Sequence, residues 1–523
     1  MFSTLAIHQM FDKYKNIIIL VLILLVGAGL RIWRLGKESL WYDELYAVWS
    51  SRFPLTEILV EQASAMHPPV YFYLGHFWFS LFTGDAGVRS FSVIWGMATI
   101  VVVFLIGSLM FNNRAALWAS ALASISPFLI WYSREATYYS WVAFISMLSF
   151  YCLLRGIKLG GRPNWIFYYA STTIAVFSHF FTPVLLLAQL ITFFLLRRQW
   201  YLRGWSLVGG LALAAQSALL VGMSMNYTRR AADAGSLMEA STFSIFISKF
   251  FNGIMASPVV LIGGPLRANV YARHILLFLS LSFVLVLLFI ASRKVREVIW
   301  EKNFMALSIS VLLLVTGPVF LFALLPYGAG VFRFYSWATP LFLIILGRLI
   351  AASPRKLGLL LGFAAIFLIT VYGTLPAVKK PNWDIRSMMT VVSQNQKYND
   401  RLLCFPVHHC VVAESQYPND VVTLGGLNDQ KNRFFLLDRG QAWSGYQNFY
   451  GDLSEDNWIS GEDLRPVISS LLLDAERVWI LAGDGTSDSY HIADGLYQGL
   501  NSDWYEVDKW IKSPYRLSLY ERR

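Results

Sequence analysis

The chain has 523 residues, of which 56% are hydrophobic and 14% are charged, and its mean hydropathy is +0.50. A soluble globular chain carries about 25% charged residues, so the composition excludes that class and indicates a protein that crosses a membrane several times. The net charge of +11 does not indicate a nucleic-acid partner, because residues 1–375 carry +16 and residues 376–523 carry −5. This is the pattern of a basic membrane region followed by a mildly acidic soluble region.

We predict eleven membrane-spanning helices, because a span needs about 20 mostly apolar residues and tight loops allow fewer. The first span has basic residues before it and no small-residue cleavage site after it, so it is interpreted as a retained signal anchor. The fifth and sixth are short and meet at "SHFFTP", where a single long helix would invert everything that follows. The predicted spans lie near 16–33, 88–111, 115–131, 137–154, 165–180, 181–196, 205–223, 274–292, 304–325, 333–351 and 357–375.

The basic residues set the predicted topology. With a cytoplasmic N-terminus, 16 of the 28 basic residues of the membrane region fall in short segments on the cytoplasmic side. The segments 34–87, 224–273 and 376–523 then face outward. We therefore predict a multi-pass protein of a bacterial inner (plasma) membrane, with an outer C-terminal domain.

Two of the outer segments have structure of their own. The aromatic stretch "HPPVYFYLGHFWFSLF" (67–82) is too short for a confident span and predicts a helix lying in the membrane interface. The tail alternates short β-like runs, "DRLLCFPV", "ERVWILAG" and "YRLSLYER", with the helical pattern "GEDLRPVISSLLLDAE". The expected fold is a polytopic α-helical membrane domain (1–375) followed by a soluble α/β or α+β domain (376–523).

The three cysteines show no metal-binding spacing. Cys404 and Cys410 would form a disulfide if the tail faces an oxidising compartment. The stretch "CFPVHHC" also admits a metal site, but a strand with polar ends is the simpler interpretation, because the usual zinc spacings are absent.

Two adjacent acids, Asp43 and Glu44 in "ESLWYDELYAVW", follow the first span. They have two interpretations. The carboxylates either solvate an outer loop beside Arg31, Arg34 and Lys37, or one of them is a general base at the outer membrane face.

Other polar residues recur at the same predicted level, each next to an outer end of a span. Arg134 and Glu135 begin the fourth span, His179 lies in the turn before the sixth, Arg333 begins the tenth, and His67 opens the interfacial helix. Each alone would be a satisfied interfacial residue. Together they would enclose a cavity in which acids lie beside Arg and His, the donors that grip a phosphate.

That arrangement suits a particular chemistry, the transfer of a sugar from a lipid phosphate. A base must take the proton of the acceptor hydroxyl, cations must stabilise the departing phosphate, and water must be excluded. Direct attack with a single base would invert the anomeric carbon, whereas retention would need a separate nucleophile. Aromatic residues such as Tyr42 and Tyr71 would stack on the faces of sugars.

Five stretches carry a resemblance to a known family: "WYDE", "HPPVYFYLGHFWFSLFTGDAGVRSFSVIWG", "SREATYYSWVAFISMLSFYCLLR", "SHFFTPVLLLAQ" and "FRFYSWATPLF". In this order they resemble the GT-C membrane glycosyltransferases, and among them the bacterial relatives of protein O-mannosyltransferases and the lipid A aminoarabinose transferase. The resemblance covers roughly residues 30–350. The opening of the tail, "KKPNWDIRSMMTVVSQNQKYNDRLL", is also similar to the start of the extracytoplasmic domain that many such relatives carry.

The resemblance implies a polyprenyl-phosphate sugar donor and an extracytoplasmic active site. It implies that Asp43 is the catalytic base, with Glu44 as its orienting partner and Glu135 as a further acid of the site. Where the aminoarabinose transferase has Lys-Pro, this chain has His67-Pro68, so the donor contact would differ and Arg333 is the second candidate for the phosphate. The candidates for donor binding are therefore His67, Arg134, His179, Arg333, Tyr42 and Tyr71.

Several alternatives remain open. No acidic trio is present, so no metal or other cofactor is predicted, although Asp43 with Glu135 would be the pair to bind a divalent ion. A lipid-glycan transporter or flippase would use the same cavity without chemistry, and a tethered binding module would act through the tail alone. The acceptor is a glycan, a glycolipid or a protein, and the sugar is not identified.

Overall fold

The computed structural model divides into two compact units, each described here by itself. Unit 1 comprises Met1–Leu35 and Ala47–Lys380, and unit 2 comprises Gly36–Tyr46 and Pro381–Arg523. The structure describes residues 4–64, 67–179, 182–197, 243–263, 292–324, 331–378, 385–397, 400–405, 421–426, 433–437, 459–460, 475–483, 504–512 and 515–522, with isolated residues between 210 and 216 and between 275 and 289.

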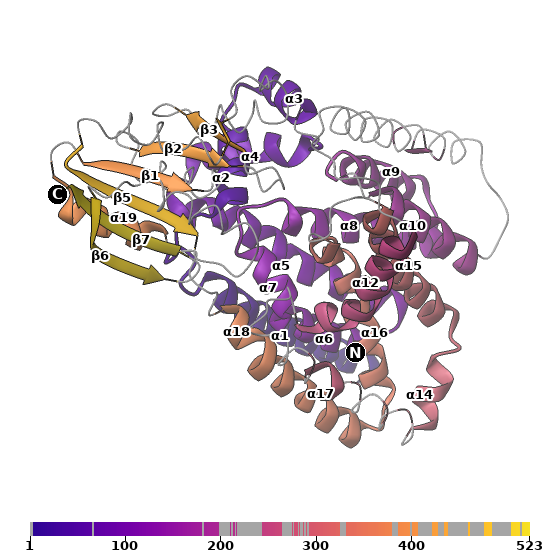
Figure 1. Ribbon diagram of the computed structural model, residues 1–523. Helices are drawn as coiled ribbons and strands as arrows, with labels where there is room; N and C mark the ends of the chain where they lie inside the picture. The colour runs from indigo at the N-terminus through magenta and orange to yellow at the C-terminus, as the bar shows by residue number, and fades with distance from the viewer. Residues whose placement is uncertain are drawn as a thin grey trace. The chain divides into compact units, whose positions relative to one another are not determined.

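Unit 1 is a bundle of apolar helices (Figure 1). Within the described residues, five helical stretches are long and apolar enough to cross a membrane, or six if a bent pair is one span. The chain is therefore a multi-pass helical membrane protein. The five stretches are Tyr14–Ile32, Gly84–Met110, Tyr139–Leu159, Lys302–Phe320 and Arg355–Thr374, and the bent pair is Asn113–Ile125 with Pro127–Ser133.

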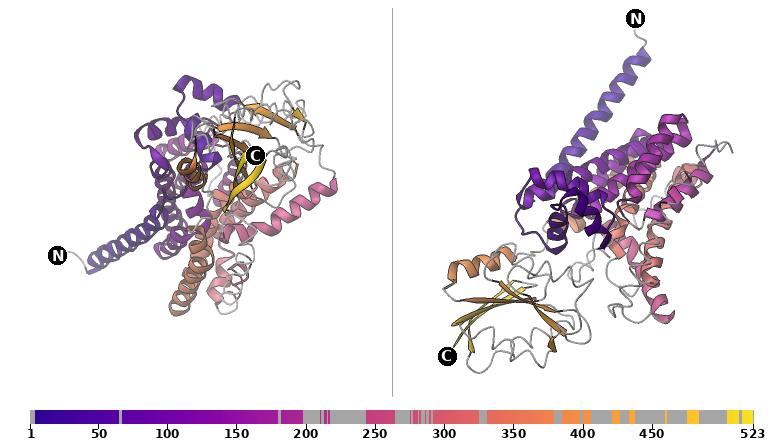
Figure 2. Two further views of the ribbon diagram at one scale, coloured as in Figure 1. Left: turned by 60° about the vertical axis from the view of Figure 1, so that its left-hand side comes forward. Right: turned by 90° about the horizontal axis from the view of Figure 1, so that it is seen from above.

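The helices of unit 1 include long spans, short apolar helices and loop helices. Their bounds are α1 (Thr4–Ile32), α3 (Leu55–Ser64), α4 (Val70–Leu81), α5 (Gly84–Met110), α6 (Asn113–Ile125), α7 (Pro127–Ser133), α8 (Tyr139–Leu159), α9 (Arg162–Val176), α10 (Thr182–Leu196), α12 (Phe243–Gly263), α14 (Arg293–Val298), α15 (Lys302–Leu324), the 3₁₀ helix η2 (Val331–Ser336), α16 (Ala338–Ala352), α17 (Arg355–Ile369), the π-helical turn η3 (Thr370–Thr374) and α18 (Leu375–Val378). The N-terminal half of α1 extends away from the other helices of the unit (Figure 2), and several apolar side chains from Tyr14 onward, such as Ile18 and Leu22, are exposed.

The break between α6 and α7 shows how sequence determines a bend. Pro127 has no backbone N–H, so α6 ends before it, and Ser126 caps α7 by accepting a hydrogen bond from the Leu129 N–H. The two helices meet at 56°. The freed carbonyls of α6 are satisfied by a buried arginine: the Arg31 Nη1 donates to the Ser124 carbonyl at 2.9 Å, and its Nη2 donates to the Ala123 carbonyl at 3.3 Å. These bonds define a structural role for Arg31, a residue that the sequence grouped with the acids of the outer loop.

Helix α16 approaches α6 very closely at a glycine. A Cβ added to Gly347 would lie 2.6 Å from both the Ala115 carbonyl oxygen and the Ala119 nitrogen. Small residues of this kind let helix backbones meet inside a membrane, where packing takes the place of the hydrophobic effect. Hydroxyl and amide groups add to this packing: Ser149 of α8 bonds Thr172 of α9 at 2.6 Å and Gln189 of α10 at 2.8 Å.

Unit 2 has a seven-stranded mixed sheet in the order β4-β3-β2-β1-β5-β7-β6. Strand β1 pairs in parallel with β2 and β5, and the other pairs are antiparallel. The helix α19 (Ile385–Asn395) packs against one face (Figure 2). The strands are β1 (Arg401–Phe405), β2 (Val421–Gly426), β3 (Arg433–Leu437), β4 (Ile459–Ser460), β5 (Arg477–Gly483), β6 (Trp504–Lys512) and β7 (Tyr515–Arg522).

The core of unit 2 lies between α19 and the middle of the sheet. Its apolar side chains alternate along each strand, as expected for a sheet with one covered face. At its margin Asp400 forms a buried ion pair with Arg477 at 3.2 Å and accepts a hydrogen bond from the Trp479 indole at 2.8 Å. The buried cluster comprises Ile385, Met388, Met389, Val392, Leu402, Trp479, Leu481, Leu517 and Leu519.

Several sequence predictions can be compared with these elements. The three predicted β-runs form β1, β5 and β7, and the stretch joined at "SHFFTP" forms two helices, α9 and α10. The predicted outer loop 224–273 contains an apolar helix, α12, which the sequence analysis did not predict. The predicted helix at 461–476, the span near 205–223 and the pairing of Cys404 with Cys410 lie mostly or wholly outside the described residues.

Candidate functional site

Two histidines of unit 1 lie on either side of one tyrosine. The His67 and His179 rings are each 5.5 Å from the ring of Tyr138, and the His179 ring is 5.4 Å from that of Trp337. We call these four residues the histidine cluster. Its members come from four separate segments of unit 1: the segment before α4, the start of α8, the α9–α10 turn and the start of α16.

Backbone and side-chain hydrogen bonds hold these places together. The Val70 N–H at the start of α4 donates to the Phe177 carbonyl at 3.3 Å, which ties the segment of His67 to the turn of His179. The Trp141 indole of α8 donates to the Ser178 hydroxyl at 2.8 Å. The Thr182 hydroxyl closes the turn by donating to the Ala175 carbonyl at 2.9 Å. The cluster is therefore a built arrangement, in which several elements determine the position of each ring.

Both histidines are neutral at physiological pH. They lie outside the membrane-spanning helices, in a pocket of aromatic rings that removes water from them. This desolvation lowers the pKa of His67 to about 4. Desolvation, followed by the repulsion of a charge on His67, lowers the pKa of His179 to about 3. A neutral imidazole still has one N–H donor and one acceptor, so the cluster offers hydrogen bonds without positive charge.

The cluster also contains a buried donor with nothing to bond. The Trp337 side chain is fully buried, and its Nε1 has no hydrogen-bond partner in the part of the chain that the structure describes. The hydroxyl of Thr137, the residue before Tyr138, is also buried and also has no hydrogen-bond partner among the described residues. Leaving a buried donor unpaired costs about 1–3 kcal/mol, so such groups mark places where a ligand oxygen would be stabilised.

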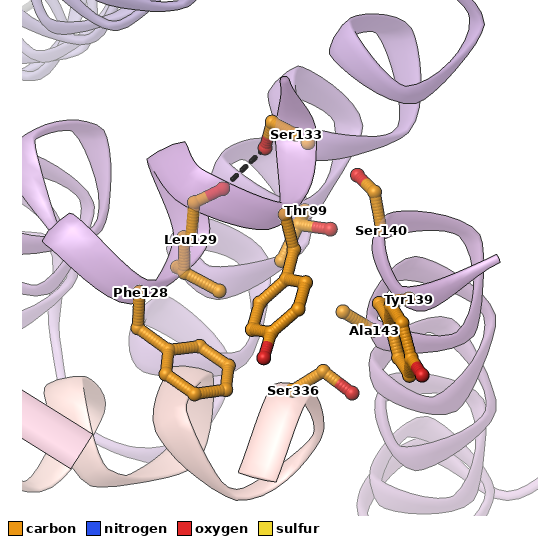
Figure 3. A pocket seen from close by; sticks show the side chains of 10 residues that line it. Thr99, Phe128, Leu129, Ser133, Tyr139, Ser140, Ala143 and Ser336 are labelled. Atoms are coloured by element: carbon orange, nitrogen blue, oxygen red, sulfur yellow. Dashed lines mark hydrogen bonds between the residues drawn. The ribbon is translucent and has the colours of Figure 1, made fainter. Parts of the chain in front are cut away.

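Figure 3 shows a small cavity lined by Tyr139 and Ser336, the sequence neighbours of Tyr138 and Trp337. Side chains of α5, α7, α8 and η2 line it, and several of them carry hydroxyls: Thr99, Tyr132, Ser133, Tyr139, Ser140 and Ser336. The cavity is large enough to hold about one water molecule. The Tyr139 hydroxyl is 3.3 Å from that of Tyr138, so a hydrogen bond connects the cavity to the histidine cluster.

The other predicted residues of unit 1 lie near the cluster in sequence. Arg134 and Glu135 are buried in the turn between α7 and α8, three to four residues before Tyr138. The Arg134 Nη1 donates to the carbonyls of Leu30 at 3.5 Å and Val378 at 3.3 Å, so this guanidinium joins the ends of three helices. Arg333 lies in η2, four residues before Trp337.

The predicted aromatic residues have different positions. Tyr71 is buried in α4, and its ring centroid is 6.2 Å from that of Tyr138. Tyr42 begins α2 (Tyr42–Ser50), but its side chain is not among those described. Sequence analysis did not single out Tyr138 or Trp337. The aromatic runs "ATYYSW" and "FYSWATP", each just after a charged candidate, were the signal for them.

The two adjacent acids, Asp43 and Glu44, belong to unit 2, whereas the histidine cluster belongs to unit 1. Glu44 is fully buried, and its Oε2 accepts a hydrogen bond from the Trp41 N–H at 3.1 Å. Because the Leu45 N–H donates to the Trp41 carbonyl, Trp41 is the N-cap of α2, and Glu44 at the third helical position supplies the acceptor half of a capping box. Asp43, one residue earlier, is half-buried. In the described part of the chain, no three His, Cys, Asp or Glu are grouped to hold a metal ion.

The class of protein follows from a match to a known family, which is one of membrane glycosyltransferases. Residues 66–221 match the family described as Dolichyl-phosphate-mannose-protein mannosyltransferase. This range includes His67, Tyr138 and His179, and it ends before Trp337. The prediction from the sequence motifs, a membrane glycosyltransferase of this kind, is therefore confirmed.

Solved structures share the fold of the chain. ArnT from Cupriavidus metallidurans in the apo state aligns with a TM-score of 0.54 and 12% identity, over 96% of this chain and 97% of that one. The same protein bound to undecaprenyl phosphate gives 0.56 and 13%, over 95% and 97%. The apo oligosaccharyltransferase of Archaeoglobus fulgidus gives 0.50 and 13%, over 92% and 71%. No curated protein matches the chain.

Proposed function

We propose that the protein transfers a sugar from a polyprenyl-phosphate donor to an acceptor hydroxyl at the extracytoplasmic face of a membrane. The observation that carries this proposal is the histidine cluster. It joins four segments of the bundle that the predicted topology puts at the outer face, and three of its four residues lie in the stretch that matches the mannosyltransferase family. The structure of ArnT with undecaprenyl phosphate gives a precedent for a lipid-phosphate ligand on this fold.

The histidine cluster would bind the donor phosphate mainly through neutral donors. The Trp337 indole N–H and one N–H from each neutral imidazole would bond phosphate oxygens, and Arg333 would supply the positive charge. An arginine stays charged at any physiological pH, whereas the desolvated histidines do not. The donor phosphate carries one negative charge and gains a second only when it leaves the sugar. Several neutral donors with one positive charge therefore suit it.

The transfer would be one displacement. The acceptor oxygen bonds to the anomeric carbon while the bond from that carbon to the phosphate oxygen breaks. The electron pair leaves with the polyprenyl phosphate, and the hydroxyl proton passes to the carboxylate of Asp43. Because attack occurs opposite the leaving group, the anomeric configuration inverts. The N–H donors and Arg333 would stabilise the charge that develops on the leaving phosphate.

The acids would have separate tasks. Asp43 is the base, Glu44 holds the helix start that carries it, and Glu135 is the second acid of the site. The capping bond from the Trp41 N–H to Glu44 supports the task of Glu44, because it fixes the start of the helix that carries Asp43.

The proposed topology has eleven spans, a cytoplasmic N-terminus and an extracytoplasmic C-terminal domain, in a bacterial inner membrane. The positive-inside distribution of basic residues supports it. In this topology α12 stays within the outer segment 224–273. We also propose that the membrane domain ends near residue 375 and that the candidate residues act as described above.

The test is turnover by the purified protein with an undecaprenyl-phosphate sugar and candidate acceptors. Asp43→Asn keeps the size of the side chain and removes its basicity, so we expect a loss of about 10²–10⁴-fold in kcat with unchanged folding. Mass spectrometry of lipid-linked and surface glycans, with and without Asp43→Asn, would identify the sugar and the acceptor from the residue that goes missing.

The matched control is Asp508→Asn, which makes the same change at an exposed position of β6 and should keep full activity. Wild-type turnover in Asp43→Asn would show that Asp43 is not the base. A flippase would move lipid-linked glycan in both variants and show no turnover in either, so the same assay separates the two functions.

A further inference from the structure

The segment that carries Asp43 forms one compact unit with the C-terminal domain. Residues Gly36–Tyr46 group with Pro381–Arg523, and the chain enters unit 1 at Ala47, in the middle of α2. Leu45 packs against the buried cluster of unit 2, which comes from α19, β1, β5 and β7. The first turn of α2 is therefore anchored on a folded domain whose sequence begins more than 300 residues later.

Helix geometry determines what this anchor does to Asp43. Successive residues of an α-helix are about 100° apart around its axis, so Asp43 and Leu45 point about 200° apart. With Leu45 on the domain core, Asp43 is directed to the opposite side of α2. Glu44, between them, is fully buried and caps the helix through Trp41. The direction of Asp43 thus depends on two attachments within the same turn.

We propose that Leu45 is a positioning residue, through which the C-terminal domain orients the carboxylate of Asp43 for proton transfer. The proposal rests on the proposed function and adds a task for the domain: it supports the catalytic turn. Displacing a reacting group by about 1 Å can cost about 10²-fold in rate, so a base on an unsupported helix end would be a poor catalyst.

The experiment compares three variants of the full chain. Leu45→Ala removes the anchor, Leu45→Met keeps its volume, and Leu59→Ala is the control because Leu59 of the same outer loop is exposed. The readouts are kcat, the KM for an undecaprenyl-phosphate sugar and the hydrogen-exchange rates of amides 42–46. Exchange needs no turnover, so it tests the anchor even if the proposed function is wrong.

We expect Leu45→Ala to exchange these amides about tenfold faster and to lose about 10–10²-fold in kcat, with a donor KM within about twofold of wild type. Leu45→Met should recover most of the rate, and Leu59→Ala should match wild type. Unchanged exchange in Leu45→Ala would show that Leu45 is no anchor. Faster exchange with wild-type kcat would show that the anchor does not orient the base.

Discussion

The two histidines of the cluster show how surroundings decide the chemistry of a side chain. The rings of His67 and His179 both contact the ring of Tyr138, and their surroundings exclude water. This desolvation disfavours the charged form of an imidazole, so both side chains stay neutral. The residue type alone suggested a cation that would grip a phosphate. The lowered pKa values instead make these rings neutral hydrogen-bond donors, and they leave the positive charge of the proposed site to Arg333.

The same pKa shifts predict a pH dependence of stability. The ordinary pKa of histidine is about 6.5, so the unfolded chain binds more protons than the folded one between about pH 6.5 and pH 4. The free energy of unfolding should be highest above pH 6.5 and should fall as the pH falls. Each histidine contributes up to about 1.4 kcal/mol per pH unit. Melting temperatures in detergent from pH 7.5 to 4.5 would measure this slope.

His179→Phe keeps an aromatic ring and removes the titrating group, so its stability should fall less steeply with acid than that of wild type. Tyr138→Phe is the control: it changes the ring that both histidines contact but removes no group that titrates in this range. Equal slopes for wild type and His179→Phe would mean that the desolvation of His179 does not influence stability.

The packing of individual helices depends on where glycines allow backbones to meet. Gly347 of α16 faces the backbone of α6, whereas Gly29 of α1 has nothing within 4 Å of an added Cβ. Sequence marks both simply as glycines inside apolar helices. Only the structure shows that one of them is a contact and the other is surface.

Gly347→Ala should therefore destabilise the protein by about 1–3 kcal/mol, because backbone atoms of Ala115 and Ala119 cannot move aside as a flexible side chain would. Gly29→Ala should be neutral or slightly stabilising, since alanine favours the helix by about 0.5–1 kcal/mol. Thermal unfolding of the two variants in the same detergent measures the difference. A Gly347→Ala variant as stable as Gly29→Ala would contradict the close contact.

Element identity could be predicted from sequence where the pattern was continuous. The apolar runs gave most helices of unit 1, and the alternating runs gave β1, β5 and β7. Helix α12 was missed because Ser248, Lys249 and Asn252 interrupt its apolar run and made it read as a loop. The cluster was predicted only in part: His67 and His179 were candidates, but the aromatic runs around Tyr138 and Trp337 do not by themselves show which of their rings meet the histidines.

The orientation of the whole molecule depends on the parity of its spans. Lys158, at the end of α8, is predicted to be cytoplasmic, and Asp508, on β6, is predicted to be outside, which requires an odd number of crossings between them. If α12 crossed the membrane as an additional span, that number would be even and both residues would lie on one side. The basic residues of the short loops favour the odd number, because an additional crossing at α12 would move the basic loops that follow it, such as those of Arg293 and Arg355, to the outer side.

Cysteine labelling distinguishes the two arrangements. Lys158 and Asp508 are both exposed, so Lys158→Cys and Asp508→Cys can be made singly in a chain whose Cys152, Cys404 and Cys410 are replaced by serine. With a membrane-impermeant maleimide on intact cells, Asp508→Cys should react and Lys158→Cys should react only after permeabilisation. Labelling of both or of neither in intact cells would mean an even number of crossings. In that case the three predicted spans between Asp43 and Lys158 would leave Asp43 on the side opposite the C-terminal domain, which would contradict their grouping in unit 2.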